Sequence, residues 1–333
     1  MKGAVLLWVL GVFLIAVLFF TYGDLGDREL SVENISPPPA ASPPPKPEEP
    51  VGARGPELEK ISKEVSKLKT AVSSLLSPPP EEKPPPPPAV KSSDLYQKAL
   101  GALVNIFCDD EAGHRYILGS GAIINPAGYV LTNAHLAEYF QQERVDCVLR
   151  RGSPARTFAK AAVLYLPDQN LKIGETQIAR KDLAILKITG PSGSIPLQES
   201  FDYFEFSPDY QPKVGEVLYS LGYPTEFLGA ELILKGANIL FTTGTVAELA
   251  DVDGNFSTAE GANLKGEISA QHGSSGGIFL EAQNGKVAGL FVGLTEGKTT
   301  AERSQFMFLS SYLDEVVRQD KGMGLLEFLN TNP

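Results

Sequence analysis

Short apolar stretches with alternating polar positions, each closed by a glycine or proline turn, run through the chain from about residue 98 onward. This period of two is typical of β-strands. Six stretches come first, enough for one small closed barrel: ALVNIFC (102–108), YILGSGAII (116–124), YVLTNAH (129–135), DCVLR (146–150), AAVLYL (161–166) and LAILKI (183–188). A second set runs from VGEVLYSLG (214–222) to SQFMFL (304–309), and SSYLDEVVRQ (310–319) predicts a helix after it. The pattern therefore predicts an all-β fold for this part of the chain.

A different pattern opens the chain, where residues 4–20 are uninterruptedly apolar, with Lys2 before them and acidic residues after them. Such a run is at the short end of what spans a membrane as a helix, and Tyr22 suits an interface anchor. We therefore expect residues 1–22 to form a transmembrane signal anchor, with the amino terminus cytoplasmic and the following chain extracytoplasmic. The alternative is a cleaved secretory signal, for which the flank FFTYGD is a poor cleavage site.

Prolines are clustered in two stretches that follow, 23–55 and 78–97, and consecutive prolines favour the stiff, extended polyproline II form. Both are expected to be linkers, with plain disorder or a proline-motif docking site as the alternatives. Between them, residues 56–77 carry apolar side chains at alternating steps of three and four, the seam of a short coiled coil. A helix this short is marginal alone, so we expect it to pair with copies of itself in a dimer or trimer; a lone helix is the alternative.

The net charge of −11 and an isoelectric point near 4.9 leave no basic footprint for DNA or RNA, so no nucleic-acid partner is expected. No C-x-x-C or H-E-x-x-H spacing occurs, and neither a metal nor another cofactor is expected. With most of its 26 prolines in the first hundred of 333 positions, the chain is best explained as one folded domain preceded by a stalk.

Candidate chemistry lies in three short motifs, TNAH (132–135), DLAILKI (182–188) and GSSGG (273–277). They supply a histidine base, an aspartate that orients it and a serine nucleophile, which are the three groups that acyl transfer by a hydroxyl requires. The candidates for the catalytic residues are therefore His135, Asp182 and Ser275, in this order.

Two other classes of hydrolase use the same three groups in a different order along the chain. Residues 273–277 also satisfy the G-x-S-x-G elbow of α/β-hydrolases, but that fold needs a histidine after the serine, and the last histidine, His272, precedes it. A subtilisin-like order needs an aspartate before the histidine, and its candidates Asp109 and Asp110 fall in an expected turn. The order His, Asp, Ser is therefore the one that the sequence supports best.

Around these motifs the chain resembles the trypsin- and chymotrypsin-like serine peptidases, and most closely their HtrA-type bacterial branch. The resemblance covers about residues 98–320. The matching stretches are GSGAIINPAGYVLTNAH (119–135), DLAILKI (182–188), LGYP (221–224), GSSGG (273–277) and GKVAGL (285–290). The resemblance implies two six-stranded antiparallel β-barrels, at 98–190 and 191–333, the second followed by the C-terminal helix. The active site would lie in the crevice between them, with Ser275 on the second barrel.

Roles within the serine motif follow from the same resemblance. The family's Gly-x-Ser-Gly-Gly pattern makes Ser275 rather than Ser274 the nucleophile. Gly273 lets the backbone turn, so that its N–H and that of Ser275 converge on the developing negative oxygen as an oxyanion hole. For an isolated SSGG, a turn without chemical meaning is the alternative.

Several positions depart from the family pattern. Ser274 stands where trypsins activated by cleavage carry an aspartate and HtrA-type enzymes usually carry asparagine, so activation by N-terminal clipping is not expected. Ile278 stands where the HtrA-type enzymes carry proline. The base of the specificity pocket should lie near Ser269, and without an acid there we expect small or medium apolar residues of the substrate rather than Lys or Arg. His272, beside the serine motif, is expected to be exposed, with contact to the substrate as the alternative.

The two cysteines, Cys108 and Cys147, fall on the first and fourth predicted strands, which are neighbours when such a barrel closes. A disulfide between them suits an extracytoplasmic protein, and two buried free thiols are the alternative.

Taken together, these features predict a membrane-anchored, extracytoplasmic serine endopeptidase, periplasmic or at the cell surface, acting on protein or peptide substrates. It would be a single-pass membrane protein, homo-oligomeric through residues 56–77, and the short chain after Ser275 is expected to hold no PDZ domain. The alternative is a catalytically idle trypsin-like scaffold that binds partners at the membrane.

Overall fold

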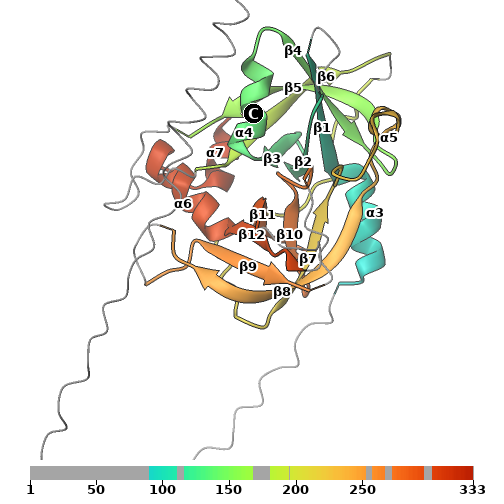
Figure 1. The fold of residues 1–333 in the computed structure, drawn as a ribbon. Coiled ribbons are helices and arrows are strands. Elements are labelled where there is room, and N and C mark those ends of the chain that lie inside the picture. Colours follow the sequence, from blue (N-terminus) through green and yellow to red (C-terminus); the bar gives the residue numbers. More distant parts are fainter. Residues whose placement is uncertain are drawn as a thin grey trace, which may run out of the picture. The chain divides into compact units, whose positions relative to one another are not determined.

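The computed structural model describes residues 90–110, 116–167, 181–194, 196–252, 257–266, 272–295 and 302–332. Within them, the chain forms two closed, six-stranded antiparallel barrels, drawn one above the other in Figure 1. The two barrels predicted from the sequence are therefore confirmed.

The first barrel closes in the order β1-β2-β3-β6-β5-β4. Its strands are β1 (Leu103–Asp110), β2 (Tyr116–Asn125), β3 (Tyr129–Thr132), β4 (Val145–Arg151), β5 (Arg156–Tyr165) and β6 (Ala184–Pro191). Alternate residues, among them Val104, Ile106, Ile123 and Leu149, form one buried cluster. Their neighbours along the strands, such as Leu103, are also buried, but in the cluster that continues into the second barrel. The period of two that marked these strands in the sequence thus separates two buried faces.

One predicted strand is shorter than expected. The stretch 129–135 is extended only as far as Thr132, and the chain then turns into the short helix α4 (Ala134–Ala137) and the 3-10 turn η1 (Glu138–Gln141). Asn133, with extended backbone angles, is the residue at which the strand gives way to the helix. His135 therefore lies on a helical turn at the barrel's rim, where its side chain is free to leave the core.

The second barrel closes in the order β10-β11-β12-β9-β8-β7. Its elements are β7 (Val217–Gly222), the short helix α5 (Ala230–Lys235), β8 (Leu240–Ala250), β9 (Gly261–Lys265), β10 (Ile278–Glu281), β11 (Val287–Leu294) and β12 (Gln305–Leu309). The apolar side chains of β10 and of residues 287–291 of β11 are buried in its core. The serine motif 273–277 immediately precedes β10, so this core anchors the loop at one end.

Three longer helices pack outside the barrels: α3 (Ser92–Ala102), α6 (Ser310–Lys321) and α7 (Leu325–Thr331). Figure 1 shows α6 and α7 on one side of the molecule and α3 on the other. The predicted helix at 310–319 is α6. In α3, Leu95, Ala99 and Ala102 recur on one buried face, and this helix runs across the linker boundary that the sequence suggested at 97/98.

Helix α7, the last element of the chain that the structure describes, packs against the first barrel. The ring of its Phe328 lies 5.5 Å from that of Tyr165 on β5, and the hydroxyl of Tyr129 on β3 donates to the carbonyl of Asn332. The segment that follows the second barrel in the sequence thus contacts the first barrel through a ring contact and a hydrogen bond.

The predicted fold class requires a correction. It placed a transmembrane helix before the barrels, but in the part of the chain that the structure describes, no helix is long and apolar enough to cross a membrane. The segments predicted as the anchor (1–22), the linker (23–55) and the coiled coil (56–77) lie outside the described residues, as does most of the second linker (78–97).

A disulfide joins Cys108 on β1 to Cys147 on β4, two residues that face each other in the register of the paired strands. Their Cα atoms are 4.0 Å apart. Of the two alternatives that the sequence left open, the structure therefore has the disulfide rather than two free thiols. The neighbouring Asp109 and Asp110 belong to β1 and not to a turn, and it is Asp182 that contacts His135.

Replacing both cysteines by alanine is expected to destabilise the barrel substantially. The bond closes a loop with a sequence separation of 39. In the chain-entropy account, a loop of this size contributes about 4 kcal/mol. For a domain of this size, the loss corresponds to a fall in Tm of about 8–16 °C. Thermal melts of the double variant and the wild type check this, with wild type plus reductant as the control. An unchanged Tm would show that the bond adds nothing to stability.

Candidate active site

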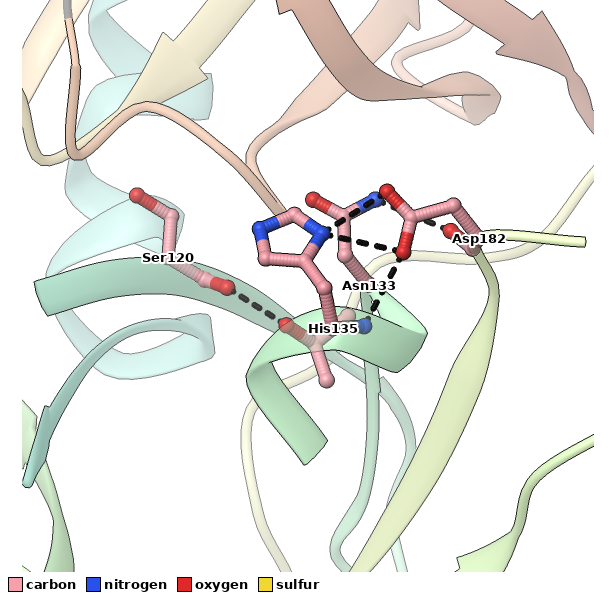
Figure 2. Close-up of polar contacts among 5 residues, drawn as sticks. Ser120, Asn133, His135 and Asp182 are labelled. Carbon is pink, nitrogen blue, oxygen red and sulfur yellow. Dashed lines mark hydrogen bonds and ion pairs between the residues drawn. The ribbon is translucent and has the colours of Figure 1, made fainter. Parts of the chain in front are cut away.

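Asp182 holds the ring of His135 from one side (Figure 2). The ring nitrogen Nδ1 lies 2.8 Å from Oδ2 and 3.0 Å from Oδ1 of the carboxylate, and Oδ1 also accepts the backbone N–H of His135 at 3.1 Å. Only 18% of the Asp182 side chain is exposed, against 48% for His135. A carboxylate at Nδ1 keeps the proton there, which leaves Nε2 with a free lone pair.

The two residues are 47 positions apart in the sequence, His135 after β3 and Asp182 just before β6. Asp182 directly precedes the segment that enters β6, and β6 pairs with β3, which leads to His135. The buried amide of Asn133 donates to the backbone carbonyl of Asp182 at 2.9 Å. This bond joins the backbone of Asp182 to the residue that precedes α4, and so helps to fix the carboxylate relative to the imidazole.

Ser275 lies in the loop 272–277, and the first barrel contacts this loop directly. The backbone N–H of Ser120 on β2 donates to the carbonyl of Ser275 at 2.7 Å. The carbonyl of Ser120 in turn accepts the hydroxyl of Thr132, three residues before His135, at 2.8 Å. The loop with the serine therefore rests on the strands that lead to the histidine. Among the described residues, the Ser275 hydroxyl makes no hydrogen bond with His135.

Four consecutive carbonyl groups of this loop accept hydrogen bonds. The pairs are His272 C=O with Thr225 N–H (2.9 Å), Gly273 C=O with the Ser120 hydroxyl (2.9 Å), Ser274 C=O with Gly277 N–H (2.8 Å) and Ser275 C=O with Ser120 N–H (2.7 Å). In a trans peptide, C=O and the next N–H point in opposite directions. The N–H groups of Gly273 and Ser275 donate no hydrogen bond within the described residues, so both are available to an anion.

Two positive backbone angles show why the loop needs glycine. Gly273 has φ of +92° and Gly276 of +80°, in the region that favours glycine. A Cβ on Gly273 would lie 2.3 Å from Oγ1 of Thr225, and one on Gly276 would lie 2.0 Å from the carbonyl oxygen of Ser120. Both conformation and close packing therefore exclude larger residues at these two positions.

A cleft of about 600 Å³ opens beside His135 and Asp182. One wall comes from the first barrel, with Glu138 next to His135, and the other from the second barrel, with residues 292–294 of β11 and Phe306 of β12. Ligand pockets have volumes in this range. The crevice between the barrels is thus large enough for several side chains of a peptide.

A family model of the trypsin-like peptidase domain matches residues 119–290. The chain belongs to the trypsin-like peptidase family. The matched range contains His135, Asp182 and the serine loop, together with the strands from β3 to β10. No curated protein matches the chain. The family membership supports a function of the serine-peptidase type, and the predicted resemblance to trypsin-like peptidases is confirmed at that level.

The sequence also led to expectations for two residues outside the candidate triad, His272 and Ser269. His272 is exposed, as expected. Ser269, expected at the base of the specificity pocket, lies outside the described residues, so the preference for small or medium apolar side chains stays a prediction.

Several residues that support the site in this trypsin-like peptidase could not be found from the sequence. Glu226, four residues after β7, accepts the backbone N–H of His272 at 3.1 Å and pairs with Arg303 through two hydrogen bonds of 2.8 and 3.0 Å. Both side chains are mostly buried, with 18% and 14% exposed. The hydrogen bonds of Arg303, and to a smaller extent the N–H of His272, hold the pKa of Glu226 below its ordinary value.

Glu226→Gln is expected to lower stability above about pH 5 and to matter less as the pH falls. Because the folded pKa lies below the unfolded value of about 4.3, the ionised carboxylate stabilises the fold above that value. This contribution is lost as the pH drops through the folded pKa. Melting curves of both proteins between pH 3 and pH 7 measure the difference in Tm. The control is Glu205→Gln, in an exposed pair with Lys286, for which little change is expected at any pH. A Tm difference for Glu226→Gln that does not change with pH would contradict this account.

Proposed function

We propose that this chain is a serine endopeptidase of the HtrA-type branch, which hydrolyses peptide bonds with His135, Asp182 and Ser275. The observation that carries the proposal is the pair of contacts from the Asp182 carboxylate to Nδ1 of His135, since these orient the imidazole as a base. In Figure 2, Nε2 points away from Asp182, toward the side of the site where Ser120 lies. The backbone N–H of Ser120 in turn donates to the carbonyl of Ser275.

The proposed reaction proceeds in two halves. The hydroxyl oxygen of Ser275 attacks the carbonyl carbon of the substrate, and its proton passes to Nε2 of His135. The negative oxygen of the tetrahedral intermediate accepts hydrogen bonds from the N–H groups of Gly273 and Ser275. The C–N bond then breaks, and the amine leaves with the proton held by His135. In the second half, water repeats these steps on the acyl-enzyme and releases the acid.

The crevice supports protein or peptide segments as the substrates. An extended chain could lie between His135 and residues 292–294 of β11, which line opposite walls of the cleft. No wall of that cleft in the described residues carries a cluster of three His, Cys, Asp or Glu side chains that could hold a metal ion. The proposed steps use the side chains and backbone groups of the chain together with one water molecule for the second half.

We propose an extracytoplasmic location for the peptidase domain. The disulfide between Cys108 and Cys147 supports it, because such bonds form and persist in oxidising compartments. The predicted membrane attachment and the predicted homo-oligomer through residues 56–77 rest on the sequence pattern alone.

A trypsin-like scaffold without activity is the second candidate, because the hydroxyl of Ser275 makes no hydrogen bond with His135 in the described residues. Catalytic hydrogen bonds are often long before a substrate binds, so this geometry does not rule out activity. Treatment of the full chain with a fluorophosphonate probe separates the two candidates, since only an activated serine reacts with it. We expect rapid labelling at Ser275; a folded protein that stays unlabelled would favour the scaffold.

A further inference from the structure

We propose that Ser120 is a positioning residue, which holds the loop 272–277 of the second barrel in the arrangement that leaves the N–H groups of Gly273 and Ser275 available. The inference rests on the proposed function, because it assigns to Ser120 the support of the proposed oxyanion hole. Ser120 itself lies on β2 of the first barrel and is fully buried, so its role is to act through the loop.

All the polar groups of Ser120 are used in contacts around the site. Its hydroxyl donates to the carbonyl of Gly273 at 2.9 Å and accepts the backbone N–H of Tyr223, just after β7, at 2.8 Å. Its backbone N–H donates to the carbonyl of Ser275, and its carbonyl accepts the hydroxyl of Thr132. Ser120 therefore joins β2, β3, the end of β7 and the serine loop at one point.

The two loop residues bound by Ser120 are the same two that carry the free N–H groups. For Gly273, the preceding carbonyl is held by Thr225 and its own carbonyl by the Ser120 hydroxyl. For Ser275, the preceding carbonyl, that of Ser274, accepts the N–H of Gly277, and its own carbonyl accepts the N–H of Ser120. Each donor residue is thus fixed on both sides. Rotation of either peptide, which would turn a carbonyl toward the anion, would have to break one of these bonds.

A hydroxyl is suited to this place because it donates and accepts at once. With alanine, the carbonyl of Gly273 and the N–H of Tyr223 would both lose their partner in a buried region. An unsatisfied buried polar group is costly, so the loop is expected to shift in search of new partners. Little room exists for this shift, because Gly276 packs directly on the carbonyl of Ser120.

The same residue also relates the serine to the histidine. Thr132, which donates to the carbonyl of Ser120, ends β3, and His135 follows on α4. The loop of the second barrel is therefore positioned against the strand that carries the base. A small displacement at Ser120 changes both the available N–H groups and the distance from Ser275 to His135.

The test compares Ser120→Ala with a matched variant, Ser310→Ala, in the full chain. Ser310 is also fully buried, and its hydroxyl also donates to a backbone carbonyl, that of Ser207, at 2.5 Å. It lies at the start of α6 and touches neither the serine loop nor His135. For Ser120→Ala we expect a fall in kcat of about 10–100-fold with KM nearly unchanged, a fraction of what a lost oxyanion donor costs. For Ser310→Ala, kcat should stay at the wild-type value, whatever happens to Tm.

Hydrogen exchange provides a readout that does not depend on hydrolysis. Backbone amides of the segment 272–277 should exchange faster in Ser120→Ala than in the wild type, and at the wild-type rate in Ser310→Ala. Unchanged exchange of this segment in folded Ser120→Ala would overturn the inference, even if the wild type proved inactive and the proposed function failed. Equal losses of kcat in both variants would also overturn it, since they would indicate general destabilisation.

Ser120→Thr completes the set, because it keeps the hydroxyl and should restore most of the kcat that alanine loses. If Ser120→Ala does not fold, Ser120→Cys takes its place with the same expected outcomes, because a thiol of similar size donates only weakly.

Discussion

Replacing Ser275 by alanine is expected to lower kcat by about 10⁵–10⁶-fold, because it removes the nucleophile while leaving the loop intact. The remaining rate should exceed that of uncatalysed hydrolysis, since the N–H groups of Gly273 and Ser275 are still present. Stability should change little, because the side chain of Ser275 makes no hydrogen bond within the described residues. Turnover of a quenched peptide substrate and labelling with a fluorophosphonate probe measure the effect.

Ser274→Ala is the matched control for this variant. It removes the neighbouring hydroxyl of the same loop, and the resemblance assigns that serine no part in the reaction. Its kcat and labelling should stay close to the wild type. Ser275→Ala that still turns over substrate at the wild-type rate, or labelling that follows Ser274 instead, would exclude Ser275 as the nucleophile.

Asp182→Asn is expected to lower kcat by about 10⁴-fold with little change in KM. An asparagine amide at this place would donate to Nδ1 of His135 and so favour the tautomer with the proton on Nε2, which cannot accept the proton of a serine. The amide of Asn133 would still bind the backbone carbonyl of residue 182, so the chain should keep its local structure. Steady-state kinetics over a range of pH, together with melting curves, measure both consequences.

Asp146→Asn is the control for the carboxylate. This residue is exposed on β4 of the same barrel and does not contact His135. It should have wild-type kinetics. If Asp182→Asn retained more than about a tenth of the wild-type kcat, the contact between the carboxylate and the imidazole would have no catalytic role of the expected size.

The strands could be predicted from the sequence because the burial of their side chains shows in the pattern of apolar and polar residues within each strand. In a barrel, side chains alternate between two environments, and this alternation appears in a single stretch of sequence whatever it pairs with. Helices α3 and α7 were not predicted. Only one face of each is buried, over two or three turns, and what buries it comes from other parts of the chain, such as Tyr165 for α7. The turn into α4 was missed for a related reason, since the apolar pattern of β3 continues past Thr132 while the backbone does not.

The chemical identity of the candidate site was available in the sequence, because acyl transfer limits the choice of side chains so strongly. His135, Asp182 and Ser275 could be named from three motifs and their order, and the structure brings His135 and Asp182 into contact. The disulfide could only be stated as one of two alternatives, because the choice depends on a distance between β1 and β4.

The supporting residues were decided by the tertiary structure alone. Thr225, Glu226 and Arg303 are ordinary polar residues in their own segments, and the stretch that contains Ser120 gives no sign of its contacts with the serine loop. Their role arises because strands far apart in the chain meet around the loop 272–277, where buried carbonyl and N–H groups each require a partner. Local patterns of burial and the demands of the chemistry can be recognised in one stretch of sequence. Which distant group satisfies a buried polar atom depends on the closing of both barrels, and that is a property of the fold as a whole.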